Sequence, residues 1–548
     1  MGDAQIGLAS NACMTCRKQK RRCTRELPAC SLCKKSGRGC MYRMCGRPPA
    51  SSEGRPTIQA ATRSHSQSPT LGGVDVAVSL PPTPSTTTAP VSVTHDFPAL
   101  FFLDFTAFQT KRQTIQIASV GLPSEYSRSL QESSPMFDVD VYFNLSVHTF
   151  LPIVSKLRLY QELTASQDHL NADLALLLIA MQLHTKPPNR EEPPNVGVYR
   201  AAKASCSFAE MSNVFSVRLL QATLLIALYE IEHAIYPAAY LTVGHCARLG
   251  LAMGLHDRKR APQMLNPPTT ASDWEERRRT WWAVIMLDRY INLGSSSKPF
   301  ACEDARADEL LPVDEKNWDR GELALVQPLA VSTNTAVQAS PFARTCQASH
   351  ILSRVLRHIN DREADDEFRY QEATQLHRTL QALSTTIVNE SSELLDKMND
   401  SMADLPLFTS LALCYSALLS LYELYCCVET AGPSQIGNPS FLEISKVALE
   451  GHKEISYKVY QLSQRVKSVV ELGGMLRMPP FVCDCLYQAG ANYAWMVSEM
   501  ANDEDMLKLT GIKNVLEMLG KRWKCAREYL DVIDNYDHAD TAIWQGGS

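Results

Sequence analysis

Six cysteines lie between residues 13 and 40, and their spacing repeats. The stretch divides into "CMTCRKQKRRC" and "CSLCKKSGRGC", two copies of C-x2-C-x6-C, whose cysteines are Cys13, Cys16, Cys23, Cys30, Cys33 and Cys40. Almost no apolar side chain stands between them, so a hydrophobic core cannot hold the segment together. Metal binding must therefore supply its folding free energy.

The number of thiols indicates how the metal is bound. Zinc in structural sites is four-coordinate, so two zinc ions need eight bonds. Six thiolates supply six bonds, and two sulfurs must then each bridge both ions, one from each half of the repeat. An iron–sulfur or redox site is the alternative, but the lysine- and arginine-rich filling disfavours it.

This segment resembles the fungal binuclear zinc cluster (Zn2Cys6) DNA-binding domain, and all six cysteine positions match. Pro28 stands where that family has a proline between its two halves. The resemblance implies that Cys13 and Cys30 bridge the ions. It also implies that Cys16 and Cys23 complete one zinc site, and Cys33 and Cys40 the other.

The basic residues of the segment are expected to meet double-stranded DNA. The resemblance implies that Lys20, four residues after the second cysteine, reads a CGG triplet in the major groove, where a cation can reach guanine O6 and N7. Neighbouring cations would contact phosphates. The further DNA-binding candidates are Arg17, Lys18, Arg21, Arg22, Lys34 and Lys35. The run "RKQKRR" could also serve as a nuclear import signal, so we expect the protein in the nucleus.

Charge divides the chain in the same way. Residues 1–47 carry a net charge of +9, and the remainder carries −14, for a total of −5. A basic arm on an acidic body suggests that the arm, and not the body, binds a polyanion.

Residues 46–95 are rich in Pro, Ser, Thr and Gly and predict a disordered linker. Many relatives carry a dimerising coiled coil after the zinc cluster, but no apolar heptads occur between Met41 and Phe97. The protein either binds DNA as a monomer or forms a homodimer through its helical domain, and the sequence leaves this open.

The rest of the chain predicts helices, because long Ala- and Leu-rich stretches carry apolar residues at helical spacing. Residues 137–345 resemble the fungal transcription factor middle domain, which implies a regulatory role and, in some members, a small-molecule effector. Residues 346–544 predict a further helical region. No segment approaches 18 consecutive apolar residues, so no membrane contact is expected.

Two details of the helical region can be tested by the structure. Ser272 or Asp273 is expected to cap the helix that runs through Trp281. Because the apolar residues of that helix surround it, Asp288 and Arg289 should be buried and need partners. A structural ion pair is favoured over an effector contact.

An enzyme is not expected. The helical region contains no HExxH, no GxSxG, no Walker loop and no GxGxxG after a strand. His245, Cys246 and His256 fall on helical faces where core residues are more common than ligands.

The predicted fold is a small zinc-organised DNA-binding module joined by a disordered linker to a mainly all-α regulatory domain. The predicted function is a zinc-dependent, sequence-specific transcription factor for RNA polymerase II. It would activate a metabolic or secondary-metabolite gene set. A repressor, or a protein-interaction module that uses the zinc cluster, is the alternative.

The C-terminal segment "EYLDVIDNYDHADTAIW" bears on activation. Acidic residues alternate there with bulky apolar ones, a mixture typical of activation segments that bind a coactivator. The alternative is the end of the last helix, with Tyr529, Val532, Ile533 and Tyr536 packed on the core.

Overall fold

The structure is a computed structural model of the 548-residue chain. The residues that it describes are 23–26, 29–35, 40, 97–111, 115, 118–132, 135–165, 170–186, 193–194, 196–257, 259–294, 298–323, 327–361, 364–398, 400–426, 438–500 and 502–545, with only the backbone for 131–132 and 536–545. The chain forms two compact units, residues 1–93 and 94–548, which we call the zinc module and the helical unit. The expected linker, residues 46–95, lies entirely outside the described residues.

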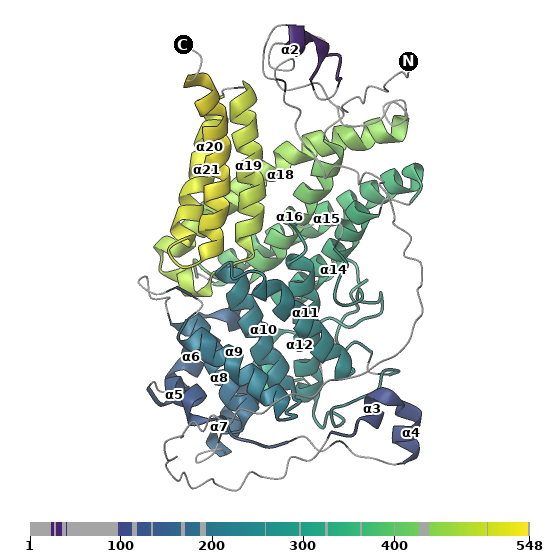
Figure 1. The fold of residues 1–548 in the computed structure, drawn as a ribbon, viewed down its shortest axis with the longest axis vertical. Coiled ribbons are helices and arrows are strands. Elements are labelled where there is room, and N and C mark those ends of the chain that lie inside the picture. The colour runs from purple at the N-terminus through teal and green to yellow at the C-terminus, as the bar shows by residue number, and fades with distance from the viewer. Residues whose placement is uncertain are drawn as a thin grey trace, which may run out of the picture. The chain divides into compact units, whose positions relative to one another are not determined.

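The first part of the helical unit contains the helices drawn from blue to teal in Figure 1. They are α3 (Leu100–Leu103), α4 (Phe105–Thr110), α5 (Ser124–Glu132), α6 (Pro135–Leu145), η1 (Val147–Thr149), α7 (Lys156–Ala165), α8 (Ala172–Thr185), α9 (Val198–Met211), α10 (Val217–Glu232), α11 (Ala238–Ala252), α12 (Ala271–Tyr290) and α13 (Glu315–Arg320).

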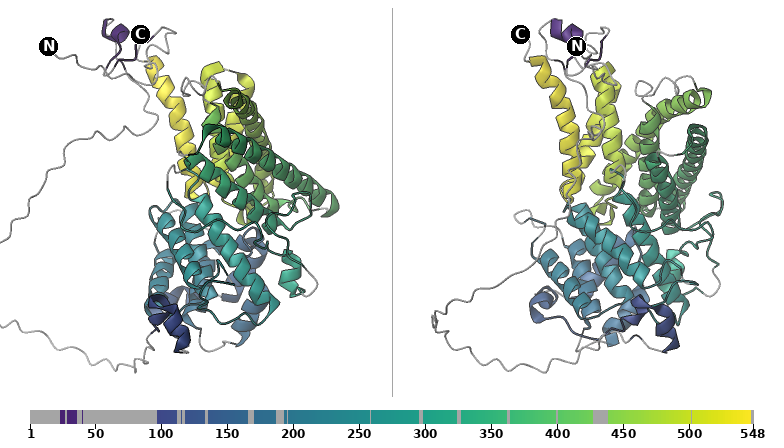
Figure 2. Two further views of the ribbon diagram at one scale, coloured as in Figure 1. Left: turned by 90° about the vertical axis from the view of Figure 1, so that its right-hand side faces the viewer. Right: turned by 45° about the vertical axis from the view of Figure 1, so that its right-hand side comes forward.

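The second part contains the green and yellow helices, which Figure 2 shows as a bundle adjoining the first part. They are α14 (Pro341–Asn360), α15 (Asp366–Met398), η2 (Leu405–Leu407), α16 (Phe408–Tyr425), α18 (Pro439–Glu471), η4 (Gly474–Arg477), α19 (Val482–Met500), α20 (Asp503–Leu519) and α21 (Lys524–Gln545). Among the described residues of this unit, extended pairing amounts to two isolated bridges, so the mainly all-α prediction is confirmed.

Side-chain caps fix where several helices begin. Ser216 accepts a hydrogen bond from the Leu219 amide at the start of α10, and Ser340 caps α14 ahead of Pro341. Thr270 caps α12 by accepting from the Asp273 amide. The expectation of a cap at Ser272 or Asp273 was therefore wrong by two or three residues, because both lie inside the first turn.

Helices α8, α10 and α12 form the centre of the first part. In α10 all residues from Arg218 to Glu232 are buried, as expected for a helix that is apolar on every side. Helix α8 packs against α6, α9 and α10, while α11 packs between α10 and α12. Gly250 permits the last contact, because a Cβ there would lie 2.6 Å from the Trp281 ring.

Charged side chains are also buried in this part, and they are paired. Glu276 of α12 is 1% exposed and accepts hydrogen bonds from the Ser155 amide, Arg158, Arg218 and Gln221. These partners come from α7, α10 and the turn before α7. The carboxylate therefore joins three segments of the chain.

Helix α16 is the centre of the second part, where α14, α15, α18 and α19 surround it. The segment Leu405–Tyr425 is the one helical stretch among the described residues that is long and apolar enough to cross a membrane, and 89% of its most apolar window is buried in the protein. The sequence did not reveal it as an 18-residue run, because Thr409, Ser410, Ser416 and Ser420 interrupt its apolar residues.

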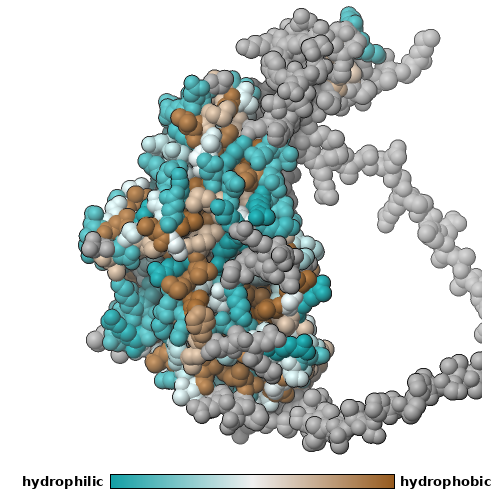
Figure 3. All heavy atoms as spheres, turned by 90° about the vertical axis from the view of Figure 1, so that its left-hand side faces the viewer, coloured by the Kyte–Doolittle hydropathy of each residue, from teal (hydrophilic) through white to brown (hydrophobic). Residues whose placement is uncertain are grey.

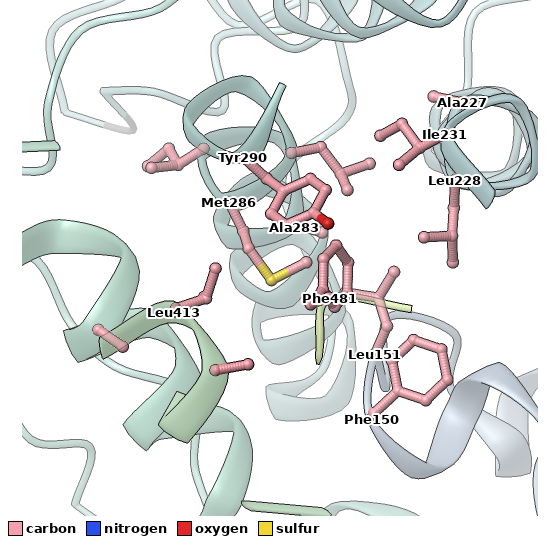
Figure 4. Close-up of a cluster of buried hydrophobic side chains, with 14 of the residues drawn as sticks. Phe150, Leu151, Ala227, Leu228, Ile231, Ala283, Met286, Tyr290, Leu413 and Phe481 are labelled. Carbon is pink, nitrogen blue, oxygen red and sulfur yellow. The ribbon is translucent and has the colours of Figure 1, made fainter. Parts of the chain in front are cut away.

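One core connects the two parts of the helical unit. Phe481, just before α19, is fully buried and packs edge-on against Phe150 and Tyr290, with Met286 and Leu413 nearby (Figure 4). The predicted boundary between residues 345 and 346 falls within α14. The division into 137–345 and 346–544 stays a prediction.

On the surface, apolar side chains gather in small groups among hydrophilic ones, as the face in Figure 3 shows. The most exposed large apolar residues include Leu103, Met211 and Leu507, which come from α3, α9 and α20. Scattered exposure of this kind is ordinary for a folded protein.

Candidate zinc centre and DNA-binding module

Three thiols converge in the described part of the zinc module. The Sγ atoms of Cys30, Cys33 and Cys40 all lie within 4.8 Å of one another. Cys30 is fully buried, Cys33 is 2% exposed, and Cys40 is partly buried. These are the three cysteines of the second C-x2-C-x6-C repeat.

A short helix produces this convergence. Helix α2 (Ser31–Lys35) begins directly after Cys30, and the Lys34 amide donates to the Cys30 carbonyl at 3.0 Å. One turn therefore separates the two cysteines of the C-x2-C pair and places their sulfurs on the same side.

Backbone amides point at the sulfurs. The Cys33 amide donates to Cys30 Sγ at 3.4 Å, and the Cys30 amide donates to Cys40 Sγ at 3.2 Å. Hydrogen bonds of this kind favour the thiolate form, which is the form that binds metal.

The first repeat meets the second near this cluster. Cys23 packs against the pair Cys30 and Cys33, and the Arg25 amide donates to Cys23 Sγ at 3.4 Å. The Ser31 amide also donates to Thr24 Oγ1 at 2.9 Å. This contact could not be predicted from the sequence, because Thr24 and Ser31 are short polar residues of no special spacing.

The donor set fits zinc. The buried apolar cluster of the described module residues consists of cysteines alone. Thiolates are preferred zinc ligands, and this residue set offers no other way to hold the segment folded. Cys33 and Cys40, with Cys30 as the shared sulfur, would hold one ion.

The DNA-binding candidates fall into two groups. Lys34 and Lys35 lie on α2 with exposed side chains. The predicted zinc ligands Cys13 and Cys16, and the predicted DNA contacts Arg17, Lys18, Lys20, Arg21 and Arg22, lie outside the described residues. Their roles stay predictions.

The buried pair Asp288 and Arg289 in the helical unit is structural, as predicted. The Asp288 carboxylate accepts from the amides of Ala301 and Cys302 at 3.0 and 3.1 Å. Arg289, fully buried, donates to it at 2.5 Å and also to the carbonyls of Cys302 and Glu303. Together they fasten the loop after α12.

The residues that were considered as enzyme groups are core or surface residues. Cys246 is fully buried, and burial raises the pKa of its thiol well above the ordinary value. His245 pairs with Glu210 at 2.6 Å on a partly exposed face. Cys206 donates to the same Glu210 carboxylate at 3.3 Å, and burial raises the pKa of its thiol to about 12, which disfavours the nucleophilic thiolate.

Comparison with known families decides whether the chain is a transcription factor or an enzyme. Residues 11–45 match the fungal Zn(2)-Cys(6) binuclear cluster domain, and residues 139–426 match the fungal specific transcription factor domain. The chain belongs to the fungal Zn2Cys6 transcription factors. It is thus a DNA-binding transcription factor with two zinc ions rather than an enzyme, and its family acts in the nucleus.

Several relatives are regulators of biosynthesis. Transcription factor BOA15 of Botryotinia fuckeliana is 40% identical over 183 residues, which cover 33% of this chain and 98% of that protein. The pigment biosynthesis transcriptional activator pigB of Monascus ruber is 27% identical over 38% of this chain and 37% of its own. The depudecin biosynthesis cluster-specific transcription activator DEP6 of Fusarium langsethiae is 24% identical over 52% of this chain and 56% of its own. The matched part of this chain thus covers 37% of the length of pigB and 56% of the length of DEP6.

Proposed function

We propose that this Zn2Cys6 transcription factor binds CGG-type half-sites and activates transcription of a secondary-metabolite gene set by RNA polymerase II. The six-cysteine repeat carries the DNA-reading part of the proposal, since its second half brings three sulfurs within 4.8 Å. The names of the two activators support the gene class. The proposed zinc ligands are all six cysteines, with Cys13 and Cys30 as bridges.

The proposed reader of the CGG triplet is Lys20, whereas Lys34 and Lys35 on α2 would meet the DNA backbone. Lys20→Ala should lose discrimination for CGG sites by about 1–3 kcal/mol if the contact is bidentate. Lys34→Ala should weaken all DNA sequences alike and reduce the salt dependence of binding. Competition binding of CGG and scrambled duplexes across a salt series measures both effects.

Two outcomes would reject the assignment. If both variants kept the parent's sequence preference, Lys20 would not be the reader. If binding of the parent did not weaken as salt rises, the module would bind a protein instead of DNA. A separate experiment, genomic occupancy mapping, would identify the target genes. The direction of their expression change when the protein is deleted would separate activator from repressor.

The last helix bears on the proposed coactivator contact. Tyr529 stacks on Tyr487 with ring centroids 4.7 Å apart, and Ile533 is fully buried. One face of the first half of α21 therefore packs on the core, which supports the alternative interpretation for Tyr529 and Ile533. Val532 is 41% exposed and does not pack there. We keep the activation proposal for residues 536–545 only.

A homodimer through the helical unit and a small-molecule effector complete the proposed partners. The domain limits 13–40, 46–95, 137–345 and 346–544 are also proposals. Residues 534–548, fused to an unrelated DNA-binding domain, should raise reporter transcription if the segment activates. This fragment leaves out the packed first half of α21.

A further inference from the structure

A cavity of about 970 Å³ opens beside the carboxyl-terminal half of α12. Its walls come from the end of α11 and the turn after it, from the loop between residues 298 and 309, and from the end of α14. Figure 1 shows α11, α12 and α14 side by side in the middle of the helical unit. A volume of this size accommodates a drug-sized molecule.

The loop wall of the cavity is held in place. Ala301 and Cys302 are bound through their amides to Asp288, and Arg289 binds the carbonyls of Cys302 and Glu303. Arg289 also stacks over the Phe300 ring at 4.1 Å. The cavity is therefore preformed on this side, which lowers the entropy cost of binding.

Part of the lining is aromatic and apolar. Trp281 of α12, 6% exposed, lines the cavity together with Phe300, Leu251 and Leu356. The Trp281 ring lies 6.2 Å from that of His256, which also lines the cavity. These surfaces suit a planar or otherwise apolar ligand body.

The acidic groups of the lining are largely occupied. Asp257 accepts from the amides of Lys259 and Arg260, each at 3.1 Å, and from Arg306 at 2.9 Å. Asp304 is shared between Arg289 at 3.0 Å and Arg357 at 2.5 Å. Two further acids, Glu309 and Asp361, already have partners within the chain.

The basic groups retain donors. The side chains of Arg306 and Arg357 are 58% and 55% exposed, and each guanidinium has more N–H groups than its one carboxylate partner uses. Arg260 and Lys298 add two cations to the rim, where Lys298 lies 4.9 Å from the Tyr240 ring. Glu303, an exposed carboxylate of the loop, is the acidic residue among these cations.

We propose that this cavity binds a small molecule with an aromatic body and an acidic group, the body against Trp281 and Phe300 and the acid at Arg260 and Lys298. This proposal names the chemical class of the effector in the proposed function. It rests on the proposed function only where it assumes that binding changes the regulation of transcription. Binding itself is measurable without DNA, so failure of the DNA-reading proposal would leave this result unaffected.

Isothermal titration of the full-length protein with 2-naphthoate and with the neutral 2-naphthamide tests the inference. Naphthoate should bind at a single site, and the amide should bind at least about tenfold more weakly. The double variant Arg260→Ala, Lys298→Ala should remove this difference and leave amide binding unchanged. Lys446→Ala, which removes an exposed lysine of α18, is the matched control.

A blocking variant shows where the ligand sits. Ala301 lines the cavity with an exposed side chain, while its amide holds the loop to Asp288. Ala301→Trp should therefore fill the cavity and abolish naphthoate binding, with thermal unfolding unchanged. Absence of binding up to about 1 mM naphthoate, or binding that Ala301→Trp leaves intact, would overturn the site. Equal binding of acid and amide would overturn the acidic ligand class.

Discussion

Cysteine is buried in both units of the chain, but its surroundings differ. In the zinc module, Cys30 and Cys33 are the buried core, and backbone amides donate to the sulfurs of Cys30 and Cys40. In the helical unit, Cys246 and Cys414 are fully buried among apolar side chains, and burial raises the pKa of each thiol. The first pair is arranged to bind metal as thiolates, whereas the second behaves as small hydrophobic residues.

The difference shows what each unit depends on for its stability. The module has almost nothing to bury, so its folding depends on the metal. The helical unit has one large hydrophobic core and a small separate cluster of Val313, Trp318 and Leu323, so its stability comes from burial of apolar side chains. Removing a metal ligand should therefore affect one unit alone, and removing a core side chain should affect the other alone.

The largest expected effect is that of Cys30→Ala in the full-length protein. If Cys30 bridges both ions, its removal takes one ligand from each, and the module should lose both zinc ions. The module should also unfold, because structural zinc supplies about 10–16 kcal/mol of apparent folding free energy in small zinc modules. Native mass spectrometry should show the loss of zinc, and DNA binding should disappear with it. The unfolding temperature of the helical unit should not change.

Cys414→Ala is the matched control for this comparison. It should retain two zinc ions and lower the stability of the helical unit by about 1–2 kcal/mol, because it leaves a small cavity in α16. Retention of full zinc content by Cys30→Ala would contradict the bridged arrangement.

The next largest effect is expected for Glu276→Ala. Its carboxylate pairs with Arg158 and Arg218 and accepts from the Ser155 amide. Its removal leaves Arg218 with Glu162 and Arg158 with Asp273, and takes away the acceptor of the buried amide. The helical unit should lose about 3–5 kcal/mol, measured by urea unfolding. Glu450→Ala, at a 71% exposed side chain of α18, should change stability by less than about 0.5 kcal/mol. Similar losses in the two variants would show that the buried network does not stabilise this unit.

Ile533→Ala tests how far the core extends into the last helix. Ile533 is fully buried against Gly490, where a Cβ would come within 2.7 Å of its Cδ1. The variant should lose about 2–4 kcal/mol by chemical unfolding. Val532→Ala, its exposed neighbour, should stay within about 0.5 kcal/mol. A stable Ile533→Ala protein would place this segment outside the core and extend the proposed activation segment toward Tyr529.

The smallest effect expected is one of pH. Burial lowers the pKa of His452 in α18 from 6.5 to about 4. The unfolded chain then binds a proton near pH 6.5 that the folded chain does not, so stability is full above pH 6.5 and falls toward pH 4. His452 should cost roughly 2 kcal/mol at pH 5, and His452→Gln should reduce the slope of unfolding free energy against pH. An unchanged slope would mean that folding does not lower the pKa of His452.

The features that could be predicted from the sequence are those set by local spacing. A C-x2-C pair brings its two sulfurs together within one helical turn, so the grouping of Cys30 and Cys33 needed no tertiary information. Helix α10 was equally apparent, since the stretch "LLQATLLIALY" is mostly apolar and long enough to predict a buried helix.

The features that could not be predicted depend on contacts distant in sequence. Arg289 was expected to need partners, but apart from the adjacent Asp288 its carbonyl partners lie 13 and 14 residues further on, in a loop without a periodic pattern. The cavity beside α12 has the same origin, because its walls come from α11, the loop and α14. Val532 was misplaced because its apolar character fits either face of α21, and only packing against α19 and α20 decides.

The burial of α16 has a consequence for synthesis of the protein. Helices α14 and α15 leave the ribosome before it, but α18 and α19 follow, and α19 ends 75 residues after Tyr425. At ordinary elongation rates this interval lasts about 4–15 s. During that time one side of this long apolar helix is uncovered. A nascent chain paused between Tyr425 and Met500 should accordingly be a strong client for chaperones that hold apolar segments.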